Sequence, residues 1–205
     1  TSLLALKLVK FENRYKKRKY LAIADEYAQA NYANAAAIDY YSRLLPHIEQ
    51  EHQSNERSQV LYQLGLIWNL VGEYDEAEDA FRQALALAQT TGDRSQEAKC
   101  RIGIGELQRN QSQFESAAQW FEQARLLSTD AADQDGIAKA MTCIGSLALY
   151  LGNYEDAQRA YDISLAIRRS MNDQRDTANV LNNLAILSAN PVSYTHLTLP
   201  TNGCV

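Results

Sequence analysis

A pattern that repeats every 40 residues constrains this chain more than any other feature of its sequence. The stretch 64–88 contains a glycine at 65, an alanine at 77 and an aromatic residue at 81. The same residue types return 40 and 80 positions later, as Gly105, Ala117, Phe121, Gly145, Ala157 and Tyr161. Apolar residues inside each unit recur at steps of three and four, which is typical of amphipathic helices. We therefore expect a repeat array of helix pairs, in which each unit buries its apolar stripes on its neighbours.

The residue types explain how such units could pack. A small residue allows two helices to approach closely, and the aromatic residue four places after each of these alanines can fill the gap to the next unit. We accordingly expect Ala77, Ala117 and Ala157 to be almost fully buried. The earliest unit is weaker, because Asp25 stands where later units have glycine, but Ala37 and Tyr41 keep the spacing in its second helix.

The clearest unit resembles the tetratricopeptide repeat. The residues that carry the resemblance are Leu64, Gly65, Trp68, Gly72, Tyr74, Ala77, Phe81 and Ala84. The resemblance implies an all-α, right-handed superhelical solenoid of antiparallel helix pairs. The unit of that family is about 34 residues long, and the longer unit here is similar to kinesin light chain-type arrays and to bacterial signalling proteins that carry ATPase or nucleotide cyclase domains.

The register divides the chain into three segments. They are a basic lead-in or linker at 1–19, the array at 20–190 and a tail at 191–205, and the array divides into 20–57, 58–97, 98–137, 138–177 and a truncated unit at 178–190. We expect Pro46 to end the second helix of the first unit. The polar segments 90–95, 128–136 and 170–176 are predicted loops. Gly92 and Asn172 suit the left-handed residue that ends a helix, and Asp93, Asp133 and Asp173 suit helix capping.

The charge of the chain is unevenly distributed. Residues 1–19 contain seven Lys or Arg and one Glu, whereas the whole chain has a net charge of −5. The basic lead-in could bind nucleic acid or anionic lipid. No aromatic stacking or groove-reading motif accompanies it, so a solvated helix or a linker is the preferred interpretation. An acidic array repels phosphate backbones, so nucleic acid is an unfavoured alternative partner.

The tail differs from the array in composition. Residues 192–201 read VSYTHLTLPT, which is rich in β-forming residues and lacks the helical period. This segment resembles the translation of a transposase-type sequencing adapter, and the similarity continues to Val205. We interpret 191–205 as a non-native tail, so His196 and Cys204 carry no functional weight. Because the chain begins with Thr1, we also expect it to be a fragment of a larger bacterial signalling protein.

The bulk properties are those of a soluble protein. Hydrophobic residues make up 46% and charged residues 22% of the chain. No apolar run is long enough to span a bilayer, and no signal peptide opens the chain. The three cysteines, Cys100, Cys143 and Cys204, show no paired spacing. A reducing, cytoplasmic location is therefore predicted, without a membrane partner.

The sequence contains no recognisable catalytic motif. It has no GxxxxGK loop, no HExxH and no GxSxG. His47 and His52 are five residues apart, which is poor spacing for one face of a helix, so a solvated loop is preferred there. We predict no catalytic, cofactor or metal site and no enzymatic activity of these 205 residues themselves, while the longer protein could be the regulatory arm of an upstream ATPase or class III nucleotide cyclase.

The predicted function is therefore protein–protein interaction or scaffolding. The resemblance implies that the first helix of each unit lines a concave groove that holds a protein or peptide. The predicted groove residues are Tyr62, Gln63, Asn69, Lys99, Glu106, Arg109, Asn110, Lys139, Thr142, Tyr150, Asn179, Asn182 and Asn183. Amides can hydrogen-bond an extended backbone, and Lys99, Arg109 and Lys139 would favour acidic groups. The truncated last unit should expose apolar residues and promote self-association.

Overall fold

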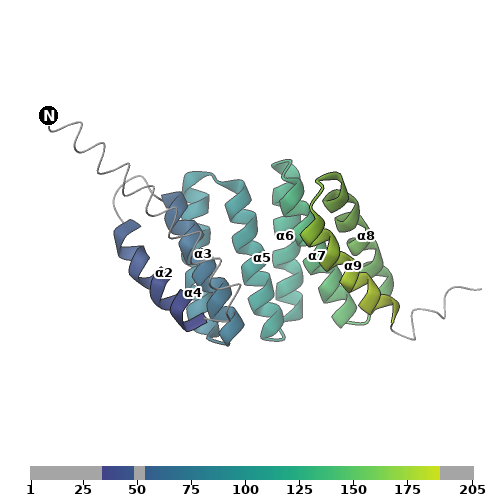
Figure 1. Cartoon of the computed structure of the whole chain (residues 1–205), viewed down its shortest axis with the longest axis horizontal. Helices are drawn as coiled ribbons and strands as arrows, with labels where there is room; N and C mark the ends of the chain where they lie inside the picture. Colours follow the sequence, from purple (N-terminus) through teal and green to yellow (C-terminus); the bar gives the residue numbers. More distant parts are fainter. Residues whose placement is uncertain (1–33, 49–53, 190–205) are drawn as a thin grey trace, which may run out of the picture. The chain divides into compact units, whose positions relative to one another are not determined.

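A computed structural model describes residues 34–48 and 54–189. In this part of the chain the regular structure is entirely helical (Figure 1). The helices are α2 Asn34–Ile48, α3 Ser54–Val71, α4 Tyr74–Thr91, α5 Arg94–Asn110, α6 Phe114–Asp130, α7 Gln134–Tyr150, α8 Tyr154–Ser170 and α9 Gln174–Ser188. The prediction of an all-α array of antiparallel helix pairs is confirmed. The basic lead-in, His52 and the tail lie outside the described residues.

The chain forms two compact units, residues 1–87 and 88–205, with the boundary inside α4. The first unit contains α2, α3 and most of α4. Its core gathers Tyr41 and Leu44 of α2, Leu64 and Ile67 of α3 and Ala80 of α4. The burial of Tyr41 and Leu44 confirms that the degenerate first repeat, 20–57, keeps its second helix in the core. None of the described helices is long and apolar enough to cross a lipid bilayer.

The repeated glycines explain how the helices of one pair approach each other. A Cβ atom added to Gly65 would lie 2.7 Å from the ring of Phe81. The same construction at Gly105 and Gly145 meets the rings of Phe121 and Tyr161 at 2.5 and 2.7 Å. Each aromatic ring therefore lies directly against a glycine, where any larger residue would displace it. The three predicted alanines, Ala77, Ala117 and Ala157, are fully buried beside these contacts.

The turns between helices are shorter than the sequence predicts. The polar segment 90–95 is a loop only at Gly92 and Asp93, and the corresponding turns after α6 and α8 occupy 131–133 and 171–173. One left-handed residue ends each helix: Gly92 has a φ of 71° and Asn172 a φ of 56°, as expected. An aspartate then caps the next helix at once. These caps are Asp93 to the amide of Gln96, Asp133 to that of Gly136 and Asp173 to that of Asp176.

Pro46 does not end α2, which corrects the prediction from the sequence. The helix continues through Pro46 and ends at Ile48, so that His47 also lies in the helix rather than in a loop. Proline adopts a helical φ but lacks the amide hydrogen and crowds the carbonyl group four residues earlier, so its place inside α2 has a local cost. The burial of Ile48 in the first core gives this last turn a packing role.

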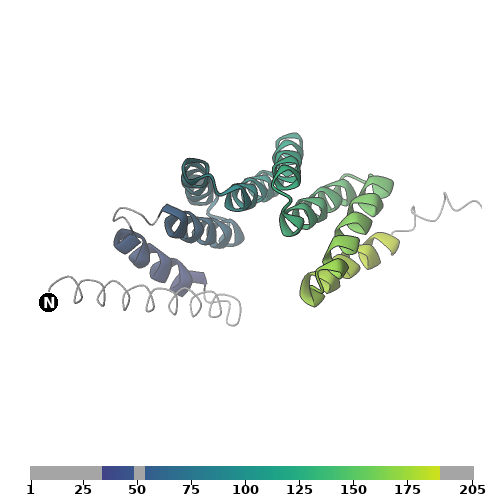
Figure 2. The same cartoon turned by 90° about the horizontal axis from the view of Figure 1, so that it is seen from above.

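In the second unit, α5, α7 and α9 are the first helices of successive repeats, and they lie in one row. Consecutive helices pack as pairs, α5 with α6 and α7 with α8, and α7 also contacts both α5 and α9. The view from above shows consecutive helices of this unit following one another in a zigzag (Figure 2). The last helix buries Val180 and Leu187 but leaves Leu181 and Ile186 about half exposed. The expected apolar surface is therefore present on α9, and self-association through it remains a prediction.

Candidate functional site

The three first helices of the repeats in the second unit, α5, α7 and α9, each present one stripe of side chains. Successive helical residues turn by about 100°, so positions seven and eleven apart lie within about 40° of each other. The stripes are Lys99, Glu106 and Asn110 on α5, Lys139, Ser146 and Tyr150 on α7, and Asn179 and Ile186 on α9. Because α7 contacts α5 and α9, the stripes lie side by side. We call this surface the first-helix face.

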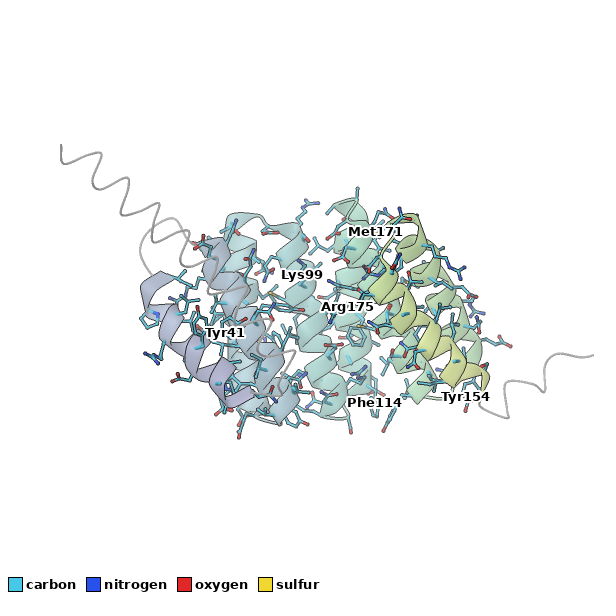
Figure 3. The ribbon with its side chains drawn as sticks, in the orientation of Figure 1. Tyr41, Lys99, Phe114, Tyr154, Met171 and Arg175 are labelled. Carbon is cyan, nitrogen blue, oxygen red and sulfur yellow. The ribbon has the colours of Figure 1, made fainter. Side chains whose placement is uncertain are left out.

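The two ends of the first-helix face differ in chemistry. Lys99 and Lys139 lie near the beginnings of their helices, and both are partly exposed. Among the described residues Lys99 has no ion pair, whereas the ammonium group of Lys139 lies 3.0 Å from Asp135. Figure 3 shows Phe114 near the lower edge of this unit and Lys99 higher up. The beginning of the face is therefore cationic, with one of its charges compensated inside the protein.

The far end of the face carries an aromatic pair. The Tyr150 side chain is 69% exposed at the end of α7. Its ring centroid lies 5.0 Å from that of Phe114, with the planes tilted by 43°. Phe114 itself packs on the core that contains Phe121 and Leu147. The exposed tyrosine is thus supported from behind by a ring that the core holds in place.

The middle of the face contains a carboxylate with few partners. Glu106 is partly buried, and its Oε1 accepts a hydrogen bond from the Cys143 thiol across a distance of 3.8 Å. Burial raises the pKa of Glu106, against the opposing effects of the Arg109 charge and the Cys143 hydrogen bond. Burial and the Glu106 charge also raise the pKa of Cys143 well above its usual value. A thiol is a weak donor, so this carboxylate is poorly compensated.

This arrangement predicts a stability effect that depends on pH. The raised pKa means that folding favours protonated Glu106, so its ionised form destabilises the fold above the unfolded pKa of about 4.3. We expect Glu106→Gln to increase the free energy of unfolding at pH 7, with a difference that disappears below about pH 4. Urea unfolding at both pH values measures this. Glu115→Gln, at an exposed position of α6, is the control, and a Glu106→Gln variant no more stable than the wild type at pH 7 would contradict the expectation.

Several residues of the predicted groove and of the first-helix face also serve the fold. The Thr142 hydroxyl lies 2.8 Å from that of Ser164 on α8, so this side chain joins two helices. Ser146 accepts a hydrogen bond from the Tyr161 hydroxyl at 3.1 Å. In the first unit, the Tyr62 ring packs at 5.9 Å from Phe81. The hydroxyl groups of Thr142 and Ser146 are therefore engaged inside the protein.

The remaining predicted residues fall into three groups. Gln63 and Asn69 are partly buried on α3, in the first unit with Tyr62. Arg109 is partly buried beside the α5 stripe, and Asn110 is exposed at its end. Asn179 and Asn182 are exposed on α9, whereas Asn183 is partly buried. The first-helix face lies in the second unit alone.

A charged cluster that sequence reasoning missed lies at the start of α7 and α9. The guanidinium group of Arg168 contacts Asp135, Asp173 and Asp176 at 2.5, 3.0 and 3.2 Å. Burial alone would raise the pKa of Asp135, but hydrogen bonds from Arg168 and Lys139 hold that pKa below its usual value. The three carboxylates lie close enough together to hold a metal ion. Because the buried arginine already contacts all three, the positive charge comes from the protein, and the cluster is a link between α7, α8 and α9.

The 40-residue spacing of the repeats could have revealed this cluster from the sequence. Arg168 stands 40 residues after Ser128, and Asp176 stands 40 residues after Gly136. A Cβ atom added to Gly136 would lie 2.3 Å from the Ser128 hydroxyl, so the small residues of that pair are in close contact. A pair that changes from two small residues to an arginine and an aspartate at the same two positions indicates direct contact between them.

Comparisons with known proteins agree with this architecture. Residues 56–126 match the family model of the tetratricopeptide repeat, and the predicted resemblance is confirmed. A comparison with curated protein sequences finds no significant match. Because the sequence identities are low, likeness to solved structures supports the fold alone.

Three of these structures illustrate the likeness. A Rap protein complexed with competence and sporulation factor is 17% identical with a TM-score of 0.76, over 85% of this chain and 49% of that one. Aspartyl phosphate phosphatase F from Bacillus subtilis is 16% identical with a TM-score of 0.74, over 87% and 47%. Kinesin light chain-like repeats from Podosopora anserina are 12% identical with a TM-score of 0.51, over 85% and 95%. The chain thus spans about half the length of the first two.

Proposed function

We propose that this array of tetratricopeptide-type repeats binds an extended, acidic segment of a partner protein on its first-helix face. Helical-repeat folds of this kind are typical of protein–protein interaction. The Rap structure described above was solved with competence and sporulation factor bound. That complex supports the proposal by analogy of fold alone, and the chemistry of the face must carry the rest.

The charges of the face favour an acidic ligand. The observation that carries the proposal is Lys99, a partly exposed cation that has no ion pair among the described residues. Arg109 lies on the same helix and forms no ion pair among the described residues, although its charge acts on the nearby Glu106. In a chain with a net charge of −5, such cations form a local exception that would steer an acidic segment toward the face.

The amides of α9 add contacts that do not depend on ligand sequence. Asn182 is exposed and Asn183 is partly exposed on this helix. An asparagine side chain offers both donors and an acceptor, so it can pair with the backbone of an extended peptide. These asparagines, which flank the α9 stripe, would thus hold the ligand backbone, while Lys99 and the neighbouring Arg109 would select its charge.

A charge reversal tests the proposal. Peptides are first selected on the wild-type chain from a random library, and their affinities are measured by fluorescence anisotropy. We expect the selected peptides to be acidic and the double variant Lys99→Glu, Arg109→Glu to bind them at least about tenfold more weakly. A charge-assisted hydrogen bond contributes about 1.5–3 kcal/mol when desolvated and much less at an exposed rim.

The matched control reverses two charges on second helices. Arg125→Glu, Arg159→Glu alters residues of α6 and α8 whose ion pairs are local, and it should bind the peptides as the wild type does. Circular dichroism verifies that both variants are folded. Equal affinities of the wild type and the Lys99, Arg109 variant would refute the proposal.

Two alternatives depend on residues outside the described part of the chain. Nucleic-acid binding would use the basic lead-in at 1–19, and a role as the regulatory arm of an ATPase or nucleotide cyclase would require further domains. Both remain predictions. Steep salt dependence of binding to an oligonucleotide would support the first of them.

A further inference from the structure

We propose that the first-helix face reads two features of its ligand at a fixed separation: an acidic group at the lysine end and an apolar side chain on Tyr150, about five residues apart. This inference rests on the proposed function and specifies its ligand. The occupant is a single extended peptide segment, and the argument follows from charge, exposure and helix geometry.

Tyr150 has the properties of an anchor for an apolar side chain. It is one of the most exposed large hydrophobic side chains of the described residues, so much of its ring is open to a ligand. Its ring contact with Phe114 at 5.0 Å supports the ring without covering it. A rigid aromatic surface that is already ordered loses little conformational entropy on binding, which is why tyrosine is enriched among the residues that dominate binding energy.

The neighbouring apolar surface extends this anchor. Leu151 directly follows Tyr150 in the chain and is 49% exposed. Successive residues turn by about 100°, so Leu151 adds exposed apolar surface at this end of the helix but does not lie on the Tyr150 stripe. Tyr150 itself lies at the end of α7, on the same stripe as Lys139 and Ser146. A ligand that reaches the lysine end of the face can therefore reach this tyrosine along one helix.

Helix geometry sets the separation of the two features. Lys139 and Tyr150 are 11 residues apart on α7, which corresponds to about 16 Å along the helix at about 1.5 Å per residue. An extended peptide advances by about 3.3 Å per residue. The acidic and apolar side chains of the ligand must therefore be about five positions apart, or slightly more when the acidic group pairs with Lys99 on the neighbouring α5, because a shorter segment cannot reach both ends.

The middle of the face favours small or polar ligand residues between these two features. Glu106 lies there as a partly buried residue whose carboxylate accepts a hydrogen bond from the Cys143 thiol, and Ser146 has its hydroxyl engaged by Thr142 and Tyr161. An acidic ligand residue opposite Glu106 would meet a like charge. The acidic group is therefore expected at the Lys99 and Lys139 end rather than in the middle.

Designed peptides test the spacing directly. The main probe carries two glutamates, four Gly/Ser residues and a tryptophan, with a fluorescent label. Matched probes shorten the spacer to one residue, replace the tryptophan by alanine or replace the glutamates by glutamines. We expect the four-residue spacer to bind best to the full chain, with each change weakening binding about fivefold or more. Failure of the main probe to bind more tightly than about 1 mM would overturn the inference.

Variants of the protein assign each preference to its residue. Tyr150→Ala should abolish the advantage of tryptophan over alanine in the probe and leave the advantage of glutamate over glutamine intact, whereas Lys99→Glu should do the reverse. Leu126→Ala, at an exposed position of α6, is the control and should change neither ratio. A tryptophan advantage that survives Tyr150→Ala would overturn the inference. If library-selected peptides still depend on Lys99 and Arg109 in that case, the proposed function stands without it.

Discussion

Phe81→Ala is expected to lower the free energy of unfolding of the first unit by roughly 3–5 kcal/mol. The Phe81 ring is fully buried, lies against Gly65 and packs beside the Tyr62 ring. Its removal leaves a cavity between α3 and α4 that helices held by short turns cannot close. Since whole domains are stable by only about 5–15 kcal/mol, this change should remove a large share of the stability of the unit.

The chain offers a clean probe and controls for this measurement. Its two tryptophans, Trp68 and Trp120, lie in different units, so urea unfolding in a Trp120→Phe background reports on the first. Gln83→Ala, at an exposed position of α4, should have little effect. Gly65→Ala should destabilise the wild type but cost much less once Phe81 is replaced by alanine, because the ring that its Cβ would meet is gone. Additive effects of the two changes would contradict the proposed contact.

Arg168→Met is expected to cost about 3 kcal/mol in the second unit, because it leaves three nearby carboxylates without their cation. Methionine keeps much of the volume of the side chain, so the loss reports on charge rather than on packing. The figure is at the low end of the range for buried ion pairs, since the aspartate side chains are about a third exposed. Urea unfolding followed by Trp120 fluorescence in a Trp68→Phe background measures the change.

The effect of Arg168→Met should also depend on pH. Arg168 depresses the pKa of Asp135 in the folded protein, so this pair stabilises the fold above the unfolded pKa of about 3.9, and the gain is lost as the pH falls through the folded value. The deficit of the Arg168→Met variant should therefore shrink below about pH 4. Arg169→Met, at an exposed position, should be nearly neutral. If Asp135→Asn and Asp176→Asn restore the stability of the Arg168→Met variant, repulsion between the carboxylates causes its stability loss. A deficit that does not shrink at low pH would contradict this explanation.

The sequence alone was sufficient to determine the repeat and its local chemistry. A small residue followed by alanine and an aromatic at constant spacing indicates one packing contact used repeatedly, and the structure contains it at Gly65 and Phe81 and again in the later units. The capping aspartates were equally readable, because a cap involves residues only three apart. Interactions of this kind depend on local spacing, which the linear order of residues contains.

Tertiary structure determined the features that differ from one repeat to the next. Ala132 and Ser112 adopt positive φ values of 53° and 61°, although neither residue type favours that region, because the packing of the flanking helices imposes the turn. The same applies to the boundaries of the helices. Residues that were expected in loops continue the helices, since capping and burial outweigh the weak preferences of polar residues at helix ends.

The candidate site was predictable in outline and not in its contacts. The register placed Lys99, Lys139 and Tyr150 on first helices, but only the structure shows that Lys139 is paired, that Tyr150 rests on Phe114 and that Glu106 meets Cys143. Each of these contacts except the Lys139 pair joins different helices. A repeat pattern specifies which positions face one another, whereas the strength of each contact depends on the two side chains that happen to occupy them, and those change from unit to unit.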